Sequence, residues 1–393
     1  MAETGSLGPS VWAVSDGRAG NAAQVRAVLQ ALGDTRRWIQ IAHINGAAHR
    51  SQPLELTPRL PWTLLPADKW PSPLASLPRD QRALLTEPWP TVWIAAGRRS
   101  APLTRAIRDL SGGKTLTVQI LDPKIAPENF DLLVTPEHDE VSGPNVIRTV
   151  GSPSYFAPDL IEQAGQSFAD LADERSKSAI IILGGTSKAH TFTEAAADRL
   201  IAQLRILAGQ GWRLRITTSR RTPVPVVAKF RAMADEIGAR FWAGPEDGEN
   251  PYLAWLVFSD CAIVTEDSAN MLSDAAWHNL PIHIARLEGR SDKFDKLHQS
   301  LIDHGAARWF GGVLETWSYP ALREADRVAD AIVARLLNWI SQCKKQITLL
   351  CILCAWCLRL RCNLLGRRQC RRYWRCSTAS SRCRFLLVCR RCW

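Results

Sequence analysis

The chain has 393 residues, of which 46% are hydrophobic, so it is too long for one ordinary core and long enough for two. Its formal net charge of +11 is located in residues 341–393, which hold 13 of the 49 Lys and Arg residues and no Asp or Glu. The preceding residues carry 36 basic and 38 acidic side chains, so their charge gives no reason to expect a nucleic-acid partner.

Cysteine is distributed in the same way as charge. Ten of the 11 cysteines lie in 341–393, and Cys261 alone lies in residues 1–340, which we call the body. A body without a disulfide framework is typical of a cytosolic protein. We see no signal peptide in "MAETGSLGPS" and no apolar run of about 18 residues. We therefore expect a cytoplasmic protein, and leave open a peripheral position at the inner face of the membrane.

Residues 341–393 are rich in Cys, Arg, Leu and Trp. This is the composition of GC-rich DNA read out of frame, so we interpret the segment as a disordered or non-native tail. Cys351, Cys354 and Cys357 form a C-x2-C-x2-C run, which leaves a zinc or iron–sulfur site as an alternative. A basic tail for a membrane surface or a nucleic acid is a further alternative.

Short β-rich runs alternate with amphipathic segments along the body. The first half predicts strands at 11–14, 38–42, 91–95, 116–121, 132–135 and 146–150, with helices at 22–32 and 102–110. The Pro- and Trp-rich stretch 50–90 is expected to be an irregular insertion, or a set of short helices, covering an apolar groove. The second half predicts strands at 179–183, 213–217, 262–265 and 281–285, with helices at 193–208, 224–237, 268–278, 293–304 and 325–340.

This alternation favours an α/β fold with parallel sheets covered on both faces. The pattern restarts near residue 178, after the polar stretch 158–177. We therefore expect two Rossmann-like domains, 1–170 and 178–340, facing a cleft. In such sheets ligands bind at the carboxyl ends of the strands.

Two glycine-containing loops follow strands in the first half. In "SDGRAGN", Gly17 and Gly20 allow a ligand to approach the backbone at a helix start. Ala19 and Ala22 stand where a dinucleotide-binding G-x-G-x-x-G motif needs glycine, which argues against a nicotinamide enzyme. A tight structural turn is the simpler alternative.

The second loop, "AAGRRSAP", places Arg98 and Arg99 after Gly97 at another helix start, where Ser100 is expected to cap the helix. Paired arginines there suit a phosphate or carboxylate, although a solvated basic turn fits as well.

Two loops of the second half have the chemistry of a diphosphate site. The first is "ILGGTSK" and the second is "ITTSRR". The candidate residues are Gly184, Gly185, Thr186, Ser187, Ser219, Arg220 and Arg221.

The stretch "IVTEDSANMLSD" places carboxylates at a strand end and on the helix that follows. Glu266, Asp267 and Asp274 are candidate acceptors for ribose or sugar hydroxyls, and Ser268 is a candidate helix cap. Simple capping by Asp267 and Ser268 is the alternative.

Three further residues are candidates. His138 with Glu137 is a candidate proton-transfer pair, although a lone loop histidine is more often a surface residue. Lys293, in "SDKFDKLH", could close over phosphates or belong to a polar helix start.

Eight motifs occur in order: "VSDGRAGN", "IAAGRRSAP", "TVQILDP", "FDLLVTPEHD", "ITTSRRTP", "DGENPY", "IVTEDSANMLSDAA" and "SDKFDKLH". Together they closely resemble the mitochondrial-fission (elongated-mitochondria) family of bacteria and plants, over about residues 10–340. Bacterial members are named as glycosyltransferases, so the resemblance implies a GT-B-like architecture with a nucleotide-sugar cleft.

The resemblance also implies roles for individual residues. The second domain would hold the nucleotide, with Asp274 on the ribose, where many relatives have Glu. The loop of Gly17, Arg18, Gly20 and Asn21, with Gly97, Arg98 and Arg99, would lie on the acceptor side, and Asp16 would be the catalytic base. No cofactor and no metal is expected, because the body has no D-x-D motif and no clustered metal ligands.

The implied activity is transfer of a sugar from a nucleoside diphosphate to an envelope glycan or a lipid-linked acceptor. Two alternatives come from other classes. Plant relatives act as adaptors that recruit a dynamin-like GTPase to mitochondria, so a non-catalytic scaffold is one. A nucleotide-sugar epimerase, which needs no acceptor, is the other. The sequence names no protein partner.

Overall fold

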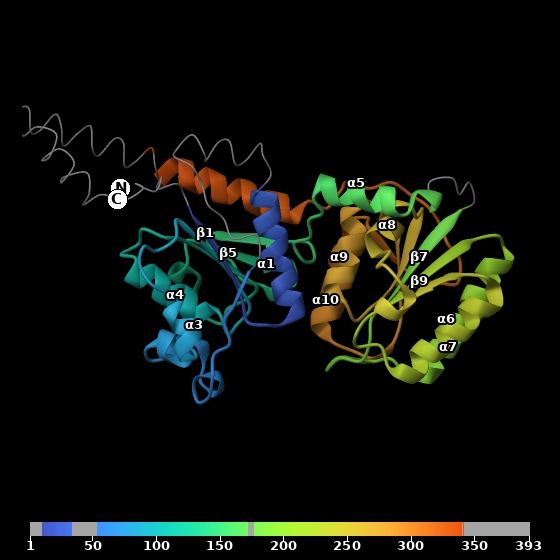
Figure 1. The fold of residues 1–393 in the computed structure, drawn as a ribbon, viewed down its shortest axis with the longest axis horizontal. Coiled ribbons are helices and arrows are strands. Elements are labelled where there is room, and N and C mark those ends of the chain that lie inside the picture. The colour runs from blue at the N-terminus through green and yellow to red at the C-terminus, as the bar shows by residue number, and fades with distance from the viewer. Residues whose placement is uncertain (1–9, 34–52, 172–176, 340, 342–393) are drawn as a thin grey trace, which may run out of the picture. The chain divides into compact units, whose positions relative to one another are not determined.

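A computed structural model describes residues 10–33, 53–171, 177–339 and 341 (Figure 1). The chain divides into two compact units, 1–331 and 332–393, and both sheets lie in the first unit. The strand expected at 38–42 and residues 342–393 lie outside the described residues.

The first sheet has six parallel strands in the order β2-β1-β3-β4-β5-β6. These are β1 Val11–Ser15, β2 Leu54–Glu55, β3 Val92–Ala96, β4 Leu116–Ile120, β5 Leu132–Pro136 and β6 Val146–Thr149. Their central residues are buried, as β-branched and apolar runs in a sheet covered on both faces should be.

Helices cover both faces of the first sheet. α1 (Ala19–Leu32) packs its apolar side against β1 and β3, and α4 (Ala101–Leu110) packs against β3 and β4. The insertion takes the second of its two expected forms, a set of short helices. It consists of the 3-10 helices η1 Trp62–Leu64, η2 Ala67–Lys69 and η3 Pro73–Ser76 and the short helix α3 Arg79–Ala83. Its buried Leu77 and Leu85 belong to one core cluster with Leu103 and Ile107 of α4.

The second sheet also has six parallel strands, in the order β10-β9-β7-β11-β12-β14. These are β7 Ser178–Leu183, β9 Arg213–Thr218, β10 Arg240–Trp242, β11 Cys261–Thr265, β12 Ile282–Ala285 and β14 Ala307–Trp309. A separate antiparallel pair joins β8 (His190–Thr191) to β13 (Glu288–Gly289).

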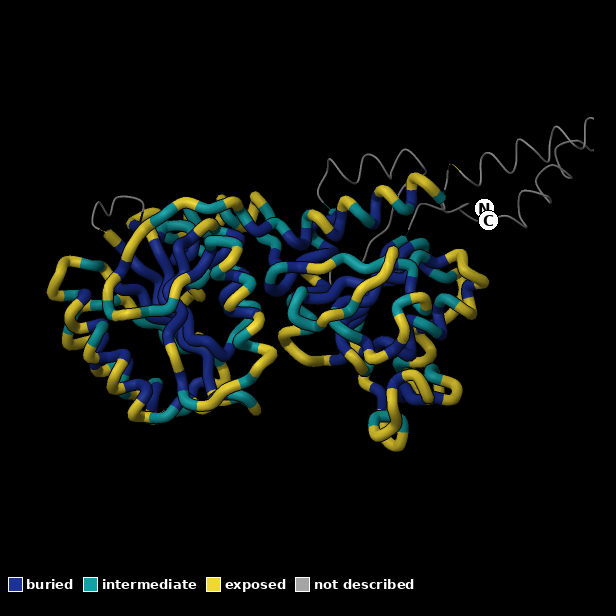
Figure 2. Tube along the Cα trace, turned by 180° about the vertical axis from the view of Figure 1, so that it is seen from behind, coloured by how far each residue is buried: buried dark blue, intermediate teal, exposed yellow. Residues whose placement is uncertain are grey.

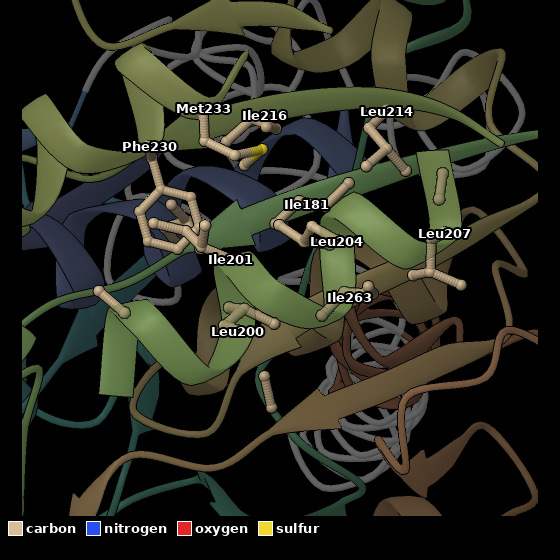
Figure 3. Packing of buried hydrophobic residues seen from close by; sticks show 14 of the residues in the cluster. Ile181, Leu200, Ile201, Leu204, Leu207, Leu214, Ile216, Phe230, Met233 and Ile263 are labelled. Carbon is tan, nitrogen blue, oxygen red and sulfur yellow. The ribbon is translucent and has the colours of Figure 1, made fainter. Parts of the chain in front are cut away.

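Two helical layers enclose the second sheet (Figure 1). α6 (Glu194–Gly209) and α7 (Val224–Ile237) cover one face, where Leu204, Phe230 and Met233 pack against Ile181 and Ile263 (Figure 3). The other face is covered by α8 Tyr252–Val257, α9 Ala269–Trp277 and α10 Asp292–Asp303. In each half the strands of the sheet are more deeply buried than the helices and loops around them (Figure 2).

The expected α/β class with two Rossmann-like sheets is confirmed. α5 (Pro158–Ser167) and the 3-10 helix η6 (Ala169–Leu171) form the polar stretch between the sheets. Further 3-10 turns are η4 Pro127–Asn129, η5 Glu137–Asp139 and η7 Pro245–Asp247. Residues 324–339 are helical, which agrees with the helix expected at 325–340.

Candidate functional site

Three candidate loops of the second half lie side by side. β7 is flanked by β9 on one side and β11 on the other, and all three strands run parallel. The loops that leave their carboxyl ends therefore meet at one edge of the sheet. These loops contain Gly184–Gly185, Ser219–Arg221 and Glu266–Ser268.

Asp267 links these loops. Its Oδ2 accepts hydrogen bonds from the Gly185 amide at 2.8 Å and from Nη2 of Arg221 at 2.9 Å. Its Oδ1 accepts one from Oγ1 of Thr265 at 2.7 Å. The Asp267 side chain is closed to solvent, so the carboxylate serves the loops and has no face left for a sugar hydroxyl.

The two glycines of "ILGGTSK" are required by close packing. A Cβ at position 184 would lie 2.1 Å from Oδ1 of Asp267, and a Cβ at 185 would lie 2.1 Å from the carbonyl oxygen of Arg221. Both distances are far below van der Waals contact. The paired glycines therefore allow the first loop to lie directly on the other two.

Arg221 is the cation that this packing presents outward. Its side chain is 45% exposed while one nitrogen is held by Asp267. Arg220 and Thr186 are exposed beside it. Oγ of Ser219 accepts from the Arg221 amide at 3.2 Å, and Oγ of Ser187 accepts from the amide of His190 at 3.1 Å. These two serines therefore shape their own turns.

Glu266 is buried beside His298, at the end of the "SDKFDKLH" motif, and His190, which the sequence did not single out. Its Oε1 accepts from the Leu287 amide at 2.6 Å, and Oε2 lies 3.9 Å from Nε2 of His190. Burial raises the pKa of Glu266. Nε2 of His298 lies 2.8 Å from the Glu266 carbonyl, and burial lowers the pKa of His298 to about 4, so this ring is neutral at pH 7.

The helix that follows, α9, begins without a side-chain cap. Ser268 occupies the N-cap position but makes no cap hydrogen bond, so the expected capping is wrong. Ser100 likewise does not cap α4, because its hydroxyl donates to the carbonyls of Ala96 and Gly97. No side-chain cap therefore occupies the first amides of α9.

Asp274 lies in the second turn of α9 and is partly exposed. Oδ1 accepts from the Ser154 hydroxyl at 2.7 Å and Oδ2 from the Tyr252 hydroxyl at 3.1 Å. Loss of hydration raises its pKa to about 6, against the effect of these two donors. Each oxygen keeps one lone pair for a further donor.

In the first half, Asp16 and Asn21 meet beside Gly97. Nδ2 of Asn21 donates to Oδ1 of Asp16 at 2.9 Å, and the Arg18 amide does so at 3.3 Å. Oδ2 of Asp16 is buried and accepts no hydrogen bond from the described residues, with Nε of Arg18 3.8 Å away. Gly97 has a φ of +92°, and a Cβ there would lie 2.3 Å from Nδ2 of Asn21.

The backbone of this loop needs Gly17 as well. Its φ is +80°, and a Cβ there would lie 2.5 Å from Oε1 of Glu55. Asn270, in the first turn of α9, donates from Nδ2 to the Gly20 carbonyl at 3.3 Å, and its Oδ1 accepts from the buried Gln24 at 3.3 Å. Sequence reasoning missed Gln24 and Asn270, because an isolated amide carries no motif. Arg98 is exposed and Arg99 is partly exposed after Gly97.

Glu137, His138 and Lys293 lie elsewhere. The first two follow β5, which is three strand positions from β1, so they are about 14 Å from the Asp16 loop. Burial lowers the pKa of His138. Nζ of Lys293 donates to Oδ1 of Asp139 at 2.8 Å, which joins the start of α10 to η5.

Two findings concern metals and membranes. Within the described ranges, no group of three or more His, Cys, Asp or Glu side chains could hold a metal ion. Over the same part of the chain, no helix is both long enough and apolar enough to cross a bilayer.

Two parallel Rossmann-like sheets, with glycine loops at the carboxyl ends of their strands, define an α/β protein of the doubly wound class. The chain belongs to the mitochondrial fission ELM1 family, whose model matches residues 19–336.

Individual relatives are distant. Mitochondrial fission protein ELM1 of Arabidopsis thaliana is 26% identical over 62% of this chain, and the match spans only 63% of the plant protein. An uncharacterized protein of Rickettsia prowazekii, RP120, is 26% identical over 62% of this chain and 79% of its own length. Among solved structures, the UDP-GlcNAc 2-epimerase of Methanocaldococcus jannaschii is similar with a TM-score of 0.46 and 9% identity, over 84% of this chain and 99% of that one.

Proposed function

We propose that this chain binds a nucleoside diphosphate sugar at the carboxyl edge of its second sheet and transfers the sugar to an acceptor at the Asp16 loop. The observation that carries the proposal is the contact of Asp267 with both Gly185 and Arg221. It fixes a glycine loop and a half-exposed cation side by side, next to the uncapped start of α9.

The diphosphate is the part of the ligand that this edge suits best. Arg221 and Arg220 supply positive charge, and the open amides of α9 supply hydrogen bonds and the positive end of the helix dipole. These groups would neutralise the leaving diphosphate without a metal ion. Asp274, with its remaining lone pairs, is the candidate acceptor for the ribose hydroxyls.

Asp16 is the candidate general base. Its Oδ2, which accepts no hydrogen bond from the described residues, would take the proton of an acceptor hydroxyl that displaces the exposed Arg18 side chain. The acceptor oxygen would then bond to the anomeric carbon of the sugar, while the bond from that carbon to the diphosphate oxygen breaks and its electron pair leaves with the diphosphate. Asn21 would hold the carboxylate through Oδ1 during this step.

An amphiphilic acceptor at a membrane surface fits the insertion. A hydrogen bond from the Arg59 amide to the Ser76 carbonyl, 2.8 Å long, closes the loop 59–76. Leu60 and Leu64 are 67% and 78% exposed on it, whereas Trp70 of the same loop is buried. The loop, light blue in Figure 1, projects from the first sheet and is largely yellow in Figure 2. Exposed leucines on a projecting loop suit the headgroup region of a bilayer.

Calorimetric titration with UDP, GDP, ADP and their sugars tests the nucleotide site. Arg221→Ala should weaken the tightest of these complexes by roughly 10- to 100-fold, the usual effect of losing a charged hydrogen bond. Arg205→Ala is the matched control, because its guanidinium is 47% exposed and paired with Glu236 on α6 and α7, and it should leave binding unchanged. A wild-type protein that binds none of these compounds at millimolar concentration would refute the enzyme and favour a non-catalytic scaffold.

A further inference from the structure

A second arginine, Arg286, lies at the same edge of the second sheet. β12 pairs with β11 so that Ala285 stands opposite Thr265. Arg286, the next residue after β12, is therefore level with the start of the Glu266–Ser268 loop. Its side chain is exposed and its guanidinium carbon lies 3.7 Å from the ring centre of Trp309 on β14.

Stacking on Trp309 fixes the plane of this guanidinium. The indole is itself held by the edge of the His298 ring, with centroids 5.3 Å apart. A guanidinium flat on an aromatic ring keeps its N–H groups pointing outward in its own plane. Little side-chain entropy then remains to be lost when a ligand binds.

Unlike the neighbouring arginines, Arg286 forms no ion pair among the described residues. Arg221 is paired with Asp267, and Arg308, stacked on Trp317 at 4.3 Å, is paired with Glu315. Among residues 10–33, 53–171 and 177–339, no carboxylate lies within ion-pair distance of the Arg286 guanidinium. The buried Glu266 lies near enough to feel this charge but forms no ion pair with it, so the Arg286 guanidinium is available to a ligand.

The guanidinium groups of Arg286 and Arg221 lie at different parts of this edge. Arg221 reaches Asp267 on the loop after β11, whereas Arg286 stacks on Trp309 of β14, and these two strands are two positions apart, which is about 10 Å along the sheet. With Arg221 at the diphosphate, Arg286 would face a different part of an extended ligand.

We propose that Arg286, held on Trp309, binds a carboxylate on the donor sugar, so that the donor is a nucleoside diphosphate uronic acid. The inference rests on the proposed function and adds the class of sugar to it. A planar guanidinium and a planar carboxylate form two parallel hydrogen bonds, a match that neutral sugars and nucleobases cannot supply.

UDP-glucuronate and UDP-glucose differ in this one carboxylate, so their affinities for the full chain test the proposal, with UDP as the reference ligand. Wild-type protein should bind UDP-glucuronate roughly 10- to 100-fold more tightly than UDP-glucose. Arg286→Ala should abolish that preference and leave the affinity for UDP unchanged. Arg286→Lys should keep only part of it, because the charge remains and the fork is lost. Arg308→Ala, which removes a stacked but already paired arginine, should keep all of it.

Three outcomes would contradict the proposal. Equal wild-type affinity for the two sugars would overturn it and leave the nucleotide site intact. An Arg286→Ala variant that loses UDP as strongly as UDP-glucuronate would also overturn it, because Arg286 would then belong to the diphosphate. Absence of binding for all three ligands would overturn both proposals.

Discussion

Asp267 and Arg221 form an ion pair 2.9 Å long in which one partner is closed to solvent and the other is 45% exposed. Both oxygens of the buried carboxylate already accept hydrogen bonds from the protein, whereas the arginine it orients is partly exposed. Asp267 therefore positions the loops, and Arg221 is the partner that remains partly exposed at this edge.

This division predicts unequal costs in stability. Asp267→Ala leaves the Gly185 amide and the Thr265 hydroxyl without their acceptor, so the free energy of unfolding should fall by about 2–4 kcal/mol. Arg221→Ala leaves the buried carboxylate without its cation but keeps its hydrogen bonds from Gly185 and Thr265, so it should cost less than Asp267→Ala. Urea unfolding of both variants measures the difference, and equal losses would contradict the assigned roles.

A methyl group tests the packing of the glycine loop. Gly184→Ala places a carbon 2.1 Å from Oδ1 of Asp267, so we expect a loss of more than about 2 kcal/mol in the free energy of unfolding. Gly209→Ala is the matched control. It lies at the end of α6, a Cβ there meets nothing within 4 Å, and alanine favours the helix by about 0.5–1 kcal/mol. A neutral Gly184→Ala would show that the loop does not need this close approach.

The proposed base can be tested by removing its charge alone. Asp16→Asn should lower turnover of the donor by about 10²- to 10⁴-fold, because an amide cannot take the acceptor's proton. Nucleotide affinity, measured by calorimetry, should change little, since Asp16 lies on the first sheet. Unchanged turnover in this variant would move the role elsewhere, with Glu137 and His138 the next candidates.

The raised pKa of Asp274 predicts a pH dependence of stability. The folded state holds this proton more tightly than the unfolded state, since the pKa rises from 3.8 to about 6 on burial. The stabilisation of the fold by the protonated Asp274 side chain is therefore complete below about pH 3.8 and is lost as the pH rises through 6. The Asp274→Asn variant cannot ionise at this position. Its free energy of unfolding relative to that of wild type should therefore increase by on the order of 1–3 kcal/mol between pH 4 and pH 7. Thermal or urea unfolding across this range checks it, and a constant difference between the proteins would contradict it.

The projecting loop predicts affinity for lipid. Replacing both Leu60 and Leu64 by serine should weaken sedimentation with vesicles of phosphatidylglycerol and phosphatidylcholine by about tenfold or more, since each buried leucine contributes about 1.5–3 kcal/mol. The control replaces Ile206 and Val224, which are 58% and 81% exposed on α6 and α7. Equal effects of the two pairs would remove the loop from the interaction.

The pattern of apolar residues predicted where the central strands and helices begin and end, because buried parallel strands are continuous apolar runs. The strand expected at 116–121 is observed at Leu116–Ile120, and the helix expected at 224–237 is observed at Val224–Ile237. Sequence reasoning missed β10 and β14, the outer strands of the second sheet, whose three residues each give too short a pattern. It also missed α8, which has only six residues.

The sequence predicted which loops form the candidate site, because strand ends and glycines mark these loops. The sequence could not show that the carboxylate oxygens of Asp267 are hydrogen-bonded within the protein. Its partners Arg221 and Gly185 are 46 and 82 residues away, so they leave no local signal. The Arg286–Trp309 stack was missed for the same reason. It depends on the pairing of β12 with β14, and Trp309 lies on one of the short strands that went unrecognised.

The order of strands has a consequence for synthesis. Each sheet begins in its interior, with β1 between β2 and β3 and β7 between β9 and β11. The first strand to leave the ribosome in each half therefore has no partner until a later segment has crossed over and returned. β7 is the apolar run "SAIIIL", so a nascent or refolding chain carries an unpaired aggregation-prone strand for that interval. Recovery from denaturant should consequently fall with rising protein concentration, and binding by chaperones should be strongest before β11 is made.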